Sequence, residues 1–289
     1  MATATSASRT DQLAWEAKVG RWAGRAALAA LVLPLVALVI VYFGIGDSPP
    51  EPAQGLPLVA ERQSVFVAVA SVQVLSLLLL GGALAFLVAA SRFRRPETLP
   101  GALPIVIVGT LGAAVAAVIP TVRLIDIASE FVGGGPRTPA RAEQLTREGS
   151  GTIVAQVDLA ARVAFGLTMV LVGISSMRAG LVSRFIGILA VVVGALVVLF
   201  GLSQSLLLFQ SQPLLFFWTG ALALVLLDRW PGGRGPAWRT GEATPWPSVA
   251  EQRAAVQRGR DGQPASGGSA GTDGPDPGPP PPRKRKRRR

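Results

Sequence analysis

The chain has 289 residues, of which 50% are hydrophobic and 16% charged, and its formal net charge is +11. It contains neither cysteine nor histidine, which excludes disulfides, zinc sites of the Cys/His type, haem ligation by histidine and histidine acid–base catalysis. The hydrophobic residues come in long uninterrupted runs, which places the chain in the membrane class.

These runs predict an all-α fold, a polytopic transmembrane bundle of about six helices. A helix needs about 20 apolar residues to cross about 30 Å of hydrocarbon. The expected spans are residues 26–43, 65–90, 103–119, 153–177, 185–202 and 206–230. The start of the sixth helix stays open, because Pro213 is also compatible with a later start and a shorter helix.

The same pattern divides the chain into four parts. Residues 1–25 form a cytoplasmic N-terminal segment that is partly amphipathic, and residues 26–230 form the six-helix transmembrane domain. Residues 231–259 form a Trp/Pro-rich juxtamembrane segment, in which Ser248 and Glu251 make a capping box for a short helix. Residues 260–289 have the composition of a disordered tail.

The distribution of Lys and Arg predicts the orientation. Most of the 28 basic residues fall on the side of the two termini, whereas the opposite loops carry only Arg62, Arg123, Arg137, Arg141 and Arg147. The positive-inside rule therefore places both termini in the cytoplasm. The abundance of Arg, Ala, Gly, Val and Pro is typical of GC-rich bacterial genomes, so the expected location is the bacterial cytoplasmic (inner) membrane.

Two local patterns concern packing and the long outer loop. Glycines recur every seven residues along the fourth and fifth helices, which favours close packing of the two backbones over a sliding or pore-lining role. The outer loop, residues 121–152, is interpreted as a solvated connector. Within it, Thr138 and Pro139 predict the start of a short helix that ends near Arg147.

Charged residues gather at the outer ends of the third and fourth helices. Asp158 and Arg162 lie four residues apart within the fourth span, with the acid first, which is the favoured order for an ion pair on one helix face. Beyond Pro120, the spacing of Arg123, Asp126 and Glu130 makes another charged face. Ionisable groups in a membrane span are costly unless paired or hydrated, so these residues form the candidate polar cluster.

Two interpretations of this cluster stay open. It lines a cavity that binds a zwitterion or carries protons, or it is an interfacial salt-bridge network from which Arg162 extends towards the outer surface. Catalysis has the weakest support, because carboxylates without a nucleophile, a base or metal-ligand spacing make a poor enzyme signature. We therefore expect no catalytic residue, no metal and no cofactor.

The chain ends in a run of seven basic residues. A cytoplasmic run of this kind is attracted to anionic lipid by about 1 kcal/mol per charge, so anionic headgroups are the expected contact. Nucleic acid is a disfavoured partner, because the run lacks aromatic residues for base stacking. The residues are Arg283, Lys284, Arg285, Lys286, Arg287, Arg288 and Arg289.

Two segments carry a family resemblance. They are residues 177–187, MRAGLVSRFIG, at the fourth-to-fifth turn, and residues 232–247, GGRGPAWRTGEATPWP, after the sixth helix. With these segments, roughly the second half of the chain resembles uncharacterised actinobacterial multi-pass integral membrane proteins. The resemblance implies a multi-pass fold and transfers no activity or binding residue.

Three functions are compared on these grounds. The sequence favours a non-enzymatic membrane scaffold or interaction protein, whose partners are membrane lipids and an unidentified membrane protein. The alternative is a small-solute or proton-coupled transporter that uses the polar cluster of helices three and four, although the two halves of the chain show no convincing repeat. A lipid-modifying membrane enzyme is third, because His and Cys are absent.

Overall fold

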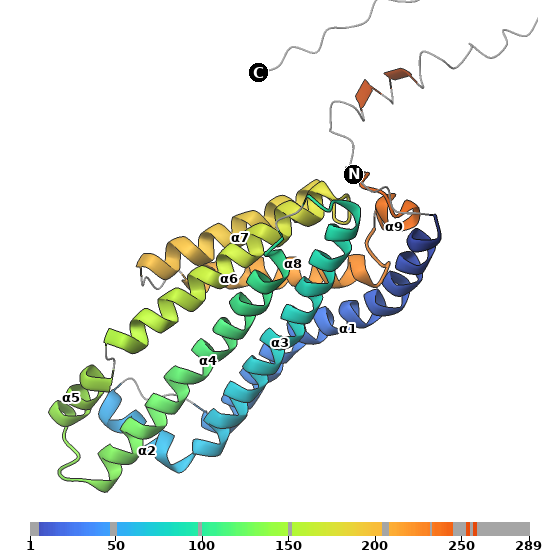
Figure 1. The fold of residues 1–289 in the computed structure, drawn as a ribbon. Coiled ribbons are helices and arrows are strands. Elements are labelled where there is room, and N and C mark those ends of the chain that lie inside the picture. The colour runs from blue at the N-terminus through green and yellow to red at the C-terminus, as the bar shows by residue number, and fades with distance from the viewer. Residues whose placement is uncertain are drawn as a thin grey trace, which may run out of the picture. The chain divides into compact units, whose positions relative to one another are not determined.

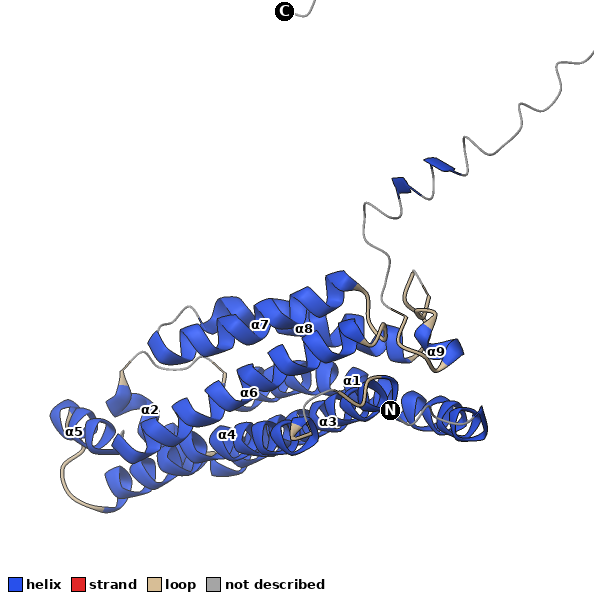
Figure 2. Cartoon of the chain, turned by 45° about the horizontal axis from the view of Figure 1, so that its top comes forward, coloured by secondary structure: helices blue, strands red, loops and turns tan. Residues whose placement is uncertain are grey.

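The structure is a computed structural model, and it describes most of the first 244 residues. Contacts divide the chain into two units, Met1–Trp246 and Pro247–Arg289. Every regular element in the described ranges is a helix (Figure 2), which confirms the predicted all-α fold. The polybasic run and the capping box of Ser248 and Glu251 lie outside the described residues. The described ranges are 6–46, 51–97, 100–149, 152–203, 208–231, 233–244, 253–254 and 257–258.

Six long helices of the first unit form a ring in which chain neighbours are also spatial neighbours. α1 packs on α3, α3 on α4, α4 on α6, α6 on α7 and α7 on α8, and α8 returns to α1. These helices coincide with the six predicted spans, although α1, α3 and α4 extend beyond them. They are α1 (Ser6–Ile45), α3 (Gln63–Arg94), α4 (Ala102–Gly133), α6 (Thr152–Arg178), α7 (Arg184–Ser203) and α8 (Leu208–Leu226).

The surface of this ring is apolar. Four helices, α1, α3, α4 and α6, are long and apolar enough to cross a membrane, and α7 and α8 contribute the shorter apolar stretches Arg184–Leu199 and Pro213–Leu226. Large apolar side chains such as Leu38, Phe43 and Val108 are exposed along it. An exposed apolar surface of this extent is stable in hydrocarbon and not in water, so the chain is a membrane-embedded protein.

Short helices lie at both ends of the bundle (Figure 1). α2 (Pro52–Glu61) and α5 (Pro139–Gly149) pack on the last turns of α4, and we call this the α5 end. α9 (Ala237–Thr240) lies at the opposite, α9 end. α5 was predicted, and Thr138 caps it, since its Oγ1 accepts a hydrogen bond from the Arg141 N–H at 3.4 Å. α2 was not predicted.

α4 differs from its prediction, because it continues through Pro120 to Gly133 and converts part of the expected outer loop into helix. The reason is packing at the α5 end. Ala128 and Phe131 are fully buried there in a small core with Leu56 of α2 and Leu145 of α5. Burial of these apolar groups stabilises the extension by more than the loss of one backbone hydrogen bond at proline costs. The start of the sixth helix was left open in the prediction. α8 begins at Leu208, so Pro213 lies inside the helix and not at its start.

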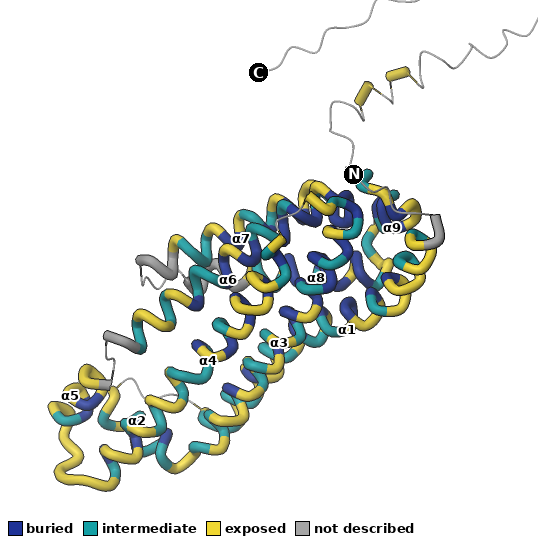
Figure 3. Tube along the Cα trace, in the orientation of Figure 1, coloured by how far each residue is buried: buried dark blue, intermediate teal, exposed yellow. Residues whose placement is uncertain are grey.

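The main core lies nearer the α9 end, where buried residues concentrate (Figure 3). Glycines bring α6 and α7 together there. A Cβ on Gly166 would lie 2.6 Å from the Gly194 carbonyl oxygen, and one on Gly173 would lie 2.8 Å from that of Gly187. The predicted close packing of these two helices is therefore confirmed.

Candidate functional site

A cavity of about 500 Å³ lies between the bundle helices, and residues from every helix of the ring line it. On α3 it is lined from Gln73 to Leu80, whereas the main core includes Leu84 and Leu87, so the cavity lies on the α5 side of the core. We call it the central cavity. Its polar lining residues are Gln73, Ser76, Thr121, Asp158, Arg162 and Thr219.

The predicted ion pair of α6 forms inside this cavity. Arg162 Nε donates to Asp158 Oδ2 at 2.7 Å, and the two side chains are 38% and 29% exposed. The two Nη atoms of Arg162 and the Oδ1 atom of Asp158 have no hydrogen-bond partner within the described part of the chain. The pair therefore offers a planar cationic edge and a carboxylate oxygen to a molecule in the cavity.

Neutral groups complete the lining. Ser76 Oγ donates to the Ala30 carbonyl at 2.8 Å and so joins α3 to α1, while Thr219 Oγ1 donates to Leu215 within α8 at 2.8 Å. Each hydroxyl keeps its acceptor lone pairs free for a ligand. Apolar residues such as Phe165 and Phe216 form the remaining wall. An apolar cavity with a few convergent polar groups is the usual form of a small-molecule site.

The structure does not bring the other three predicted cluster residues to this cavity. Arg123, Asp126 and Glu130 are exposed on α4 and form no ion pair within the described ranges. They follow Thr121 by two, five and nine residues, which at 3.6 residues per turn rotates them by roughly 140–200° from it. The proposed five-residue cluster is therefore split between the central cavity and another face of α4.

A second polar group, at the α9 end, was missed from the sequence. Arg94 of α3 and Glu16 of α1 form a bidentate ion pair with side-chain exposures of 0% and 2%. Arg94 also donates to the carbonyl oxygens of Ala90 and Ala237. The only local signal was the four-residue spacing of Gln12 and Glu16, whose side chains are hydrogen-bonded at 2.9 Å.

Trp238 covers this ion pair and connects it to α6 and α7. Its ring lies 5.5 Å from the Arg94 guanidinium carbon and 5.2 Å from that of Arg234, distances typical of cation–π contacts. Its Nε1 donates to the Leu181 carbonyl at 2.8 Å. Residues 233–244 and the turn between α6 and α7 thus meet at this hydrogen bond.

Comparison with protein-family models, with curated proteins and with solved structures finds no match for this chain. Within the described residues there is also no group of three or more His, Cys, Asp or Glu side chains that could hold a metal ion. Function therefore has to be argued from the central cavity and the polar groups on its wall.

Proposed function

We propose that this membrane protein binds a small zwitterionic solute in the central cavity, as a small-solute transporter does. The observation that carries the proposal is the Asp158–Arg162 pair on the wall of a 500 Å³ space between the helices. A carboxylate on the solute would pair with the free Nη groups of Arg162, and an ammonium group would pair with Asp158. Ionisable residues inside a membrane domain support such a role.

The closure of the α9 end supports the same proposal. Between the central cavity and that end lie fully buried side chains from several helices, among them Leu84, Met169 and Leu222. The Glu16–Arg94 pair holds α1 and α3 together beyond them. A cavity closed on one side by a packed core is the arrangement that alternating access requires of one end state.

The interaction-protein hypothesis rested on the polybasic tail, and the outer loop was interpreted as a solvated connector. The tail lies outside the described residues, and α4 and α5 make part of the loop regular helix. Neither segment supplies a contact that identifies a protein partner, whereas the central cavity supplies named groups for a ligand. The solute-binding proposal is therefore the one that the geometry supports best.

The proposal extends to orientation and location. Arg92, Arg95, Arg178, Arg184 and Arg239 all belong to the α9 end, where α3 and α6 finish and α7 begins. This excess supports a cytoplasmic position of the α9 end and of both termini, by the positive-inside rule. Together with the actinobacterial resemblance, it supports location in the bacterial cytoplasmic membrane.

Water accessibility of the cavity tests the proposal, and the absence of native cysteine makes the test direct. Thr121→Cys and Thr219→Cys place a thiol on the cavity wall with little change in volume. In protein reconstituted into nanodiscs, both should react with a small charged methanethiosulfonate reagent. Ser129→Cys, exposed at the α5 end, is the reactive control, and Ser91→Cys, fully buried in α3, is the unreactive one.

Protection of the cavity thiol by solute is the second readout. If the cavity binds zwitterions, millimolar neutral amino acids or betaine should slow modification of Thr219→Cys without changing that of Ser129→Cys. If both cavity thiols behave like Ser91→Cys, the space is dry or filled by lipid, and the solute-binding proposal is wrong.

A further inference from the structure

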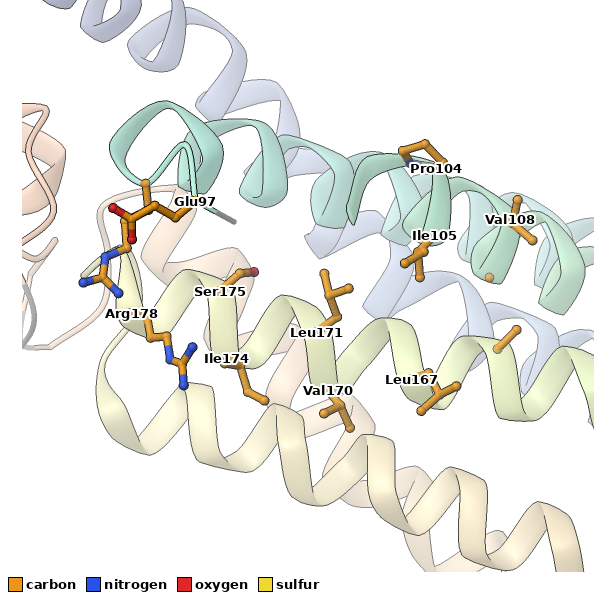
Figure 4. A pocket seen from close by; sticks show the side chains of 13 residues that line it. Glu97, Pro104, Ile105, Val108, Leu167, Val170, Leu171, Ile174, Ser175 and Arg178 are labelled. Carbon is orange, nitrogen blue, oxygen red and sulfur yellow. The ribbon is translucent and has the colours of Figure 1, made fainter. Parts of the chain in front are cut away.

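A second hollow runs along the outside of the bundle, between α4 and α6. Its volume is about 740 Å³, and its wall is mostly aliphatic. Figure 4 shows apolar side chains along its length and the charged residues Glu97 and Arg178 at one end. We call it the α4–α6 groove. Its apolar wall includes Ile105, Val108, Leu167, Val170, Leu171 and Ile174.

The far end of the groove is set by a close contact of α4 with α6. A Cβ on Gly109 would lie 2.9 Å from the Ala164 carbonyl oxygen and even closer to Thr168. Thr168 Oγ1 donates to the Ile105 carbonyl at 3.2 Å, which fixes the two helices at this level. The groove is the space between the two helices on the α9 side of this contact.

The groove is long enough to hold an acyl chain across one leaflet of a bilayer. Ala164 and Arg178, at opposite ends of its wall on α6, are fourteen residues apart, which is about 21 Å of helix at about 1.5 Å per residue. The hydrocarbon core of a bilayer is about 30 Å thick, so one leaflet is about 15 Å. An acyl chain that enters the groove at its charged end would therefore fit within it and end short of the contact between Gly109 and Ala164.

The charged end has the chemistry of a phosphate site. Arg95 and Arg178 line it, and neither forms an ion pair with a described residue. Arginine binds phosphate oxygens through two parallel N–H donors. Glu97 also lines this end, so its three charged groups carry a net charge of +1, which complements a single phosphodiester.

We propose that the α4–α6 groove is a binding site for one anionic phospholipid. The phosphate lies between Arg95 and Arg178, and an acyl chain lies on the aliphatic side chains of the two helices. This site is independent of the solute-binding proposal, because none of its lining residues lines the central cavity. Its lining residues are also different from those of the polybasic run, for which the sequence predicts attraction to anionic lipid by charge alone.

Native mass spectrometry of the full chain provides the test. The protein is equilibrated in detergent with equal amounts of phosphatidylglycerol, phosphatidylethanolamine and phosphatidylcholine, and the retained lipid is identified. We expect one phosphatidylglycerol to be retained in preference to the other two. Since each interfacial arginine contributes about 1 kcal/mol, Arg95→Gln/Arg178→Gln should lower that preference by about ten-fold or more.

A matched control separates the groove from general surface charge. Arg92→Gln/Arg184→Gln removes two exposed arginines of the same end that do not line the groove, and leaves the same net charge and the same tail. It should retain the preference within about two-fold. Glu97→Gln should increase it, because a carboxylate beside the phosphate is lost. Leu167→Trp, at a side chain that is 54% exposed, should reduce retention by filling the groove.

Three outcomes would overturn the proposal. Equal losses in the two double variants would show only surface electrostatics. Equal retention of phosphatidylethanolamine and phosphatidylglycerol would show recognition of a zwitterionic headgroup. Unchanged retention in Leu167→Trp together with loss in Arg95→Gln/Arg178→Gln would place the lipid elsewhere at the same end.

Discussion

The Glu16 carboxylate receives two hydrogen bonds from Arg94, 2.6 Å to Nη1 and 2.7 Å to Nη2, although 78 residues separate them in the chain. Both side chains are almost completely removed from solvent. Glu16→Gln should therefore destabilise the fold by about 3–5 kcal/mol, because it leaves the guanidinium buried without its counter-charge. Thermal unfolding in detergent measures this loss.

The control for this pair is Arg92→Gln, an exposed arginine two residues earlier on α3, which should change stability by no more than about 0.5 kcal/mol. Replacement of both partners by apolar residues, Glu16→Met/Arg94→Met, should cost less than either single change, since no charge stays buried. Equal effects of Glu16→Gln and Arg92→Gln would contradict the structural role of the pair.

The Asp158–Arg162 pair should behave differently, because both side chains are partly exposed within the central cavity. Arg162→Gln and Asp158→Asn should each change stability by only about 0.5 kcal/mol, the usual range for a helical pair at this spacing. They should nevertheless abolish the protection of Thr219→Cys by zwitterions. Arg123→Gln, at an exposed site on α4, should leave protection intact. Large destabilisation without loss of protection would mean that the pair is structural.

Glycine packing between α6 and α7 yields a further test. Gly166→Ala should destabilise the bundle by about 1–3 kcal/mol, because the new methyl group would overlap the Gly194 backbone. Gly82→Ala is the matched change within α3, where a Cβ meets nothing within 4 Å. It should be neutral or stabilising by up to about 1 kcal/mol, since alanine is the better helix former. Equal effects at the two positions would argue against tight α6–α7 contact.

The orientation of the bundle can be measured in intact cells. Thr138→Cys lies before α5 and Ser183→Cys lies in the turn between α6 and α7, at the two opposite ends. A membrane-impermeant maleimide should modify Thr138→Cys from outside and should reach Ser183→Cys only after the cells are opened. The reverse pattern would place the α9 end outside.

The sequence predicted those parts of the structure that depend on local spacing. The six apolar runs correspond to the six ring helices, and the four-residue spacing of Asp158 and Arg162 correctly predicted an ion pair. The short helix after Thr138 was also recognised, because its cap residue and the following proline are adjacent.

The parts that depend on contacts between distant segments were not predicted. Nothing in the neighbourhood of Arg94 shows that Glu16 and the Ala237 carbonyl will surround it. α2 was missed because it contains two prolines and only ten residues. Its apolar side chains pack on the part of α4 beyond Pro120 and on α5, contacts that the local sequence does not reveal. The separation of Arg123 from Arg162 likewise follows from how α4 is rotated in the ring.

The closed ring of helices also has a consequence for biosynthesis. Five of its six contacts join helices that leave the ribosome one after another, whereas the contact of α1 with α8 needs the last helix of the bundle. The side of α1 that contacts α8 therefore has no neighbour from this chain until α8 has been synthesised. The Ala237 carbonyl that binds Arg94 arrives later still. A nascent chain that stops before α8 would therefore lack both closing contacts, the one between α1 and α8 and the one between Arg94 and Ala237.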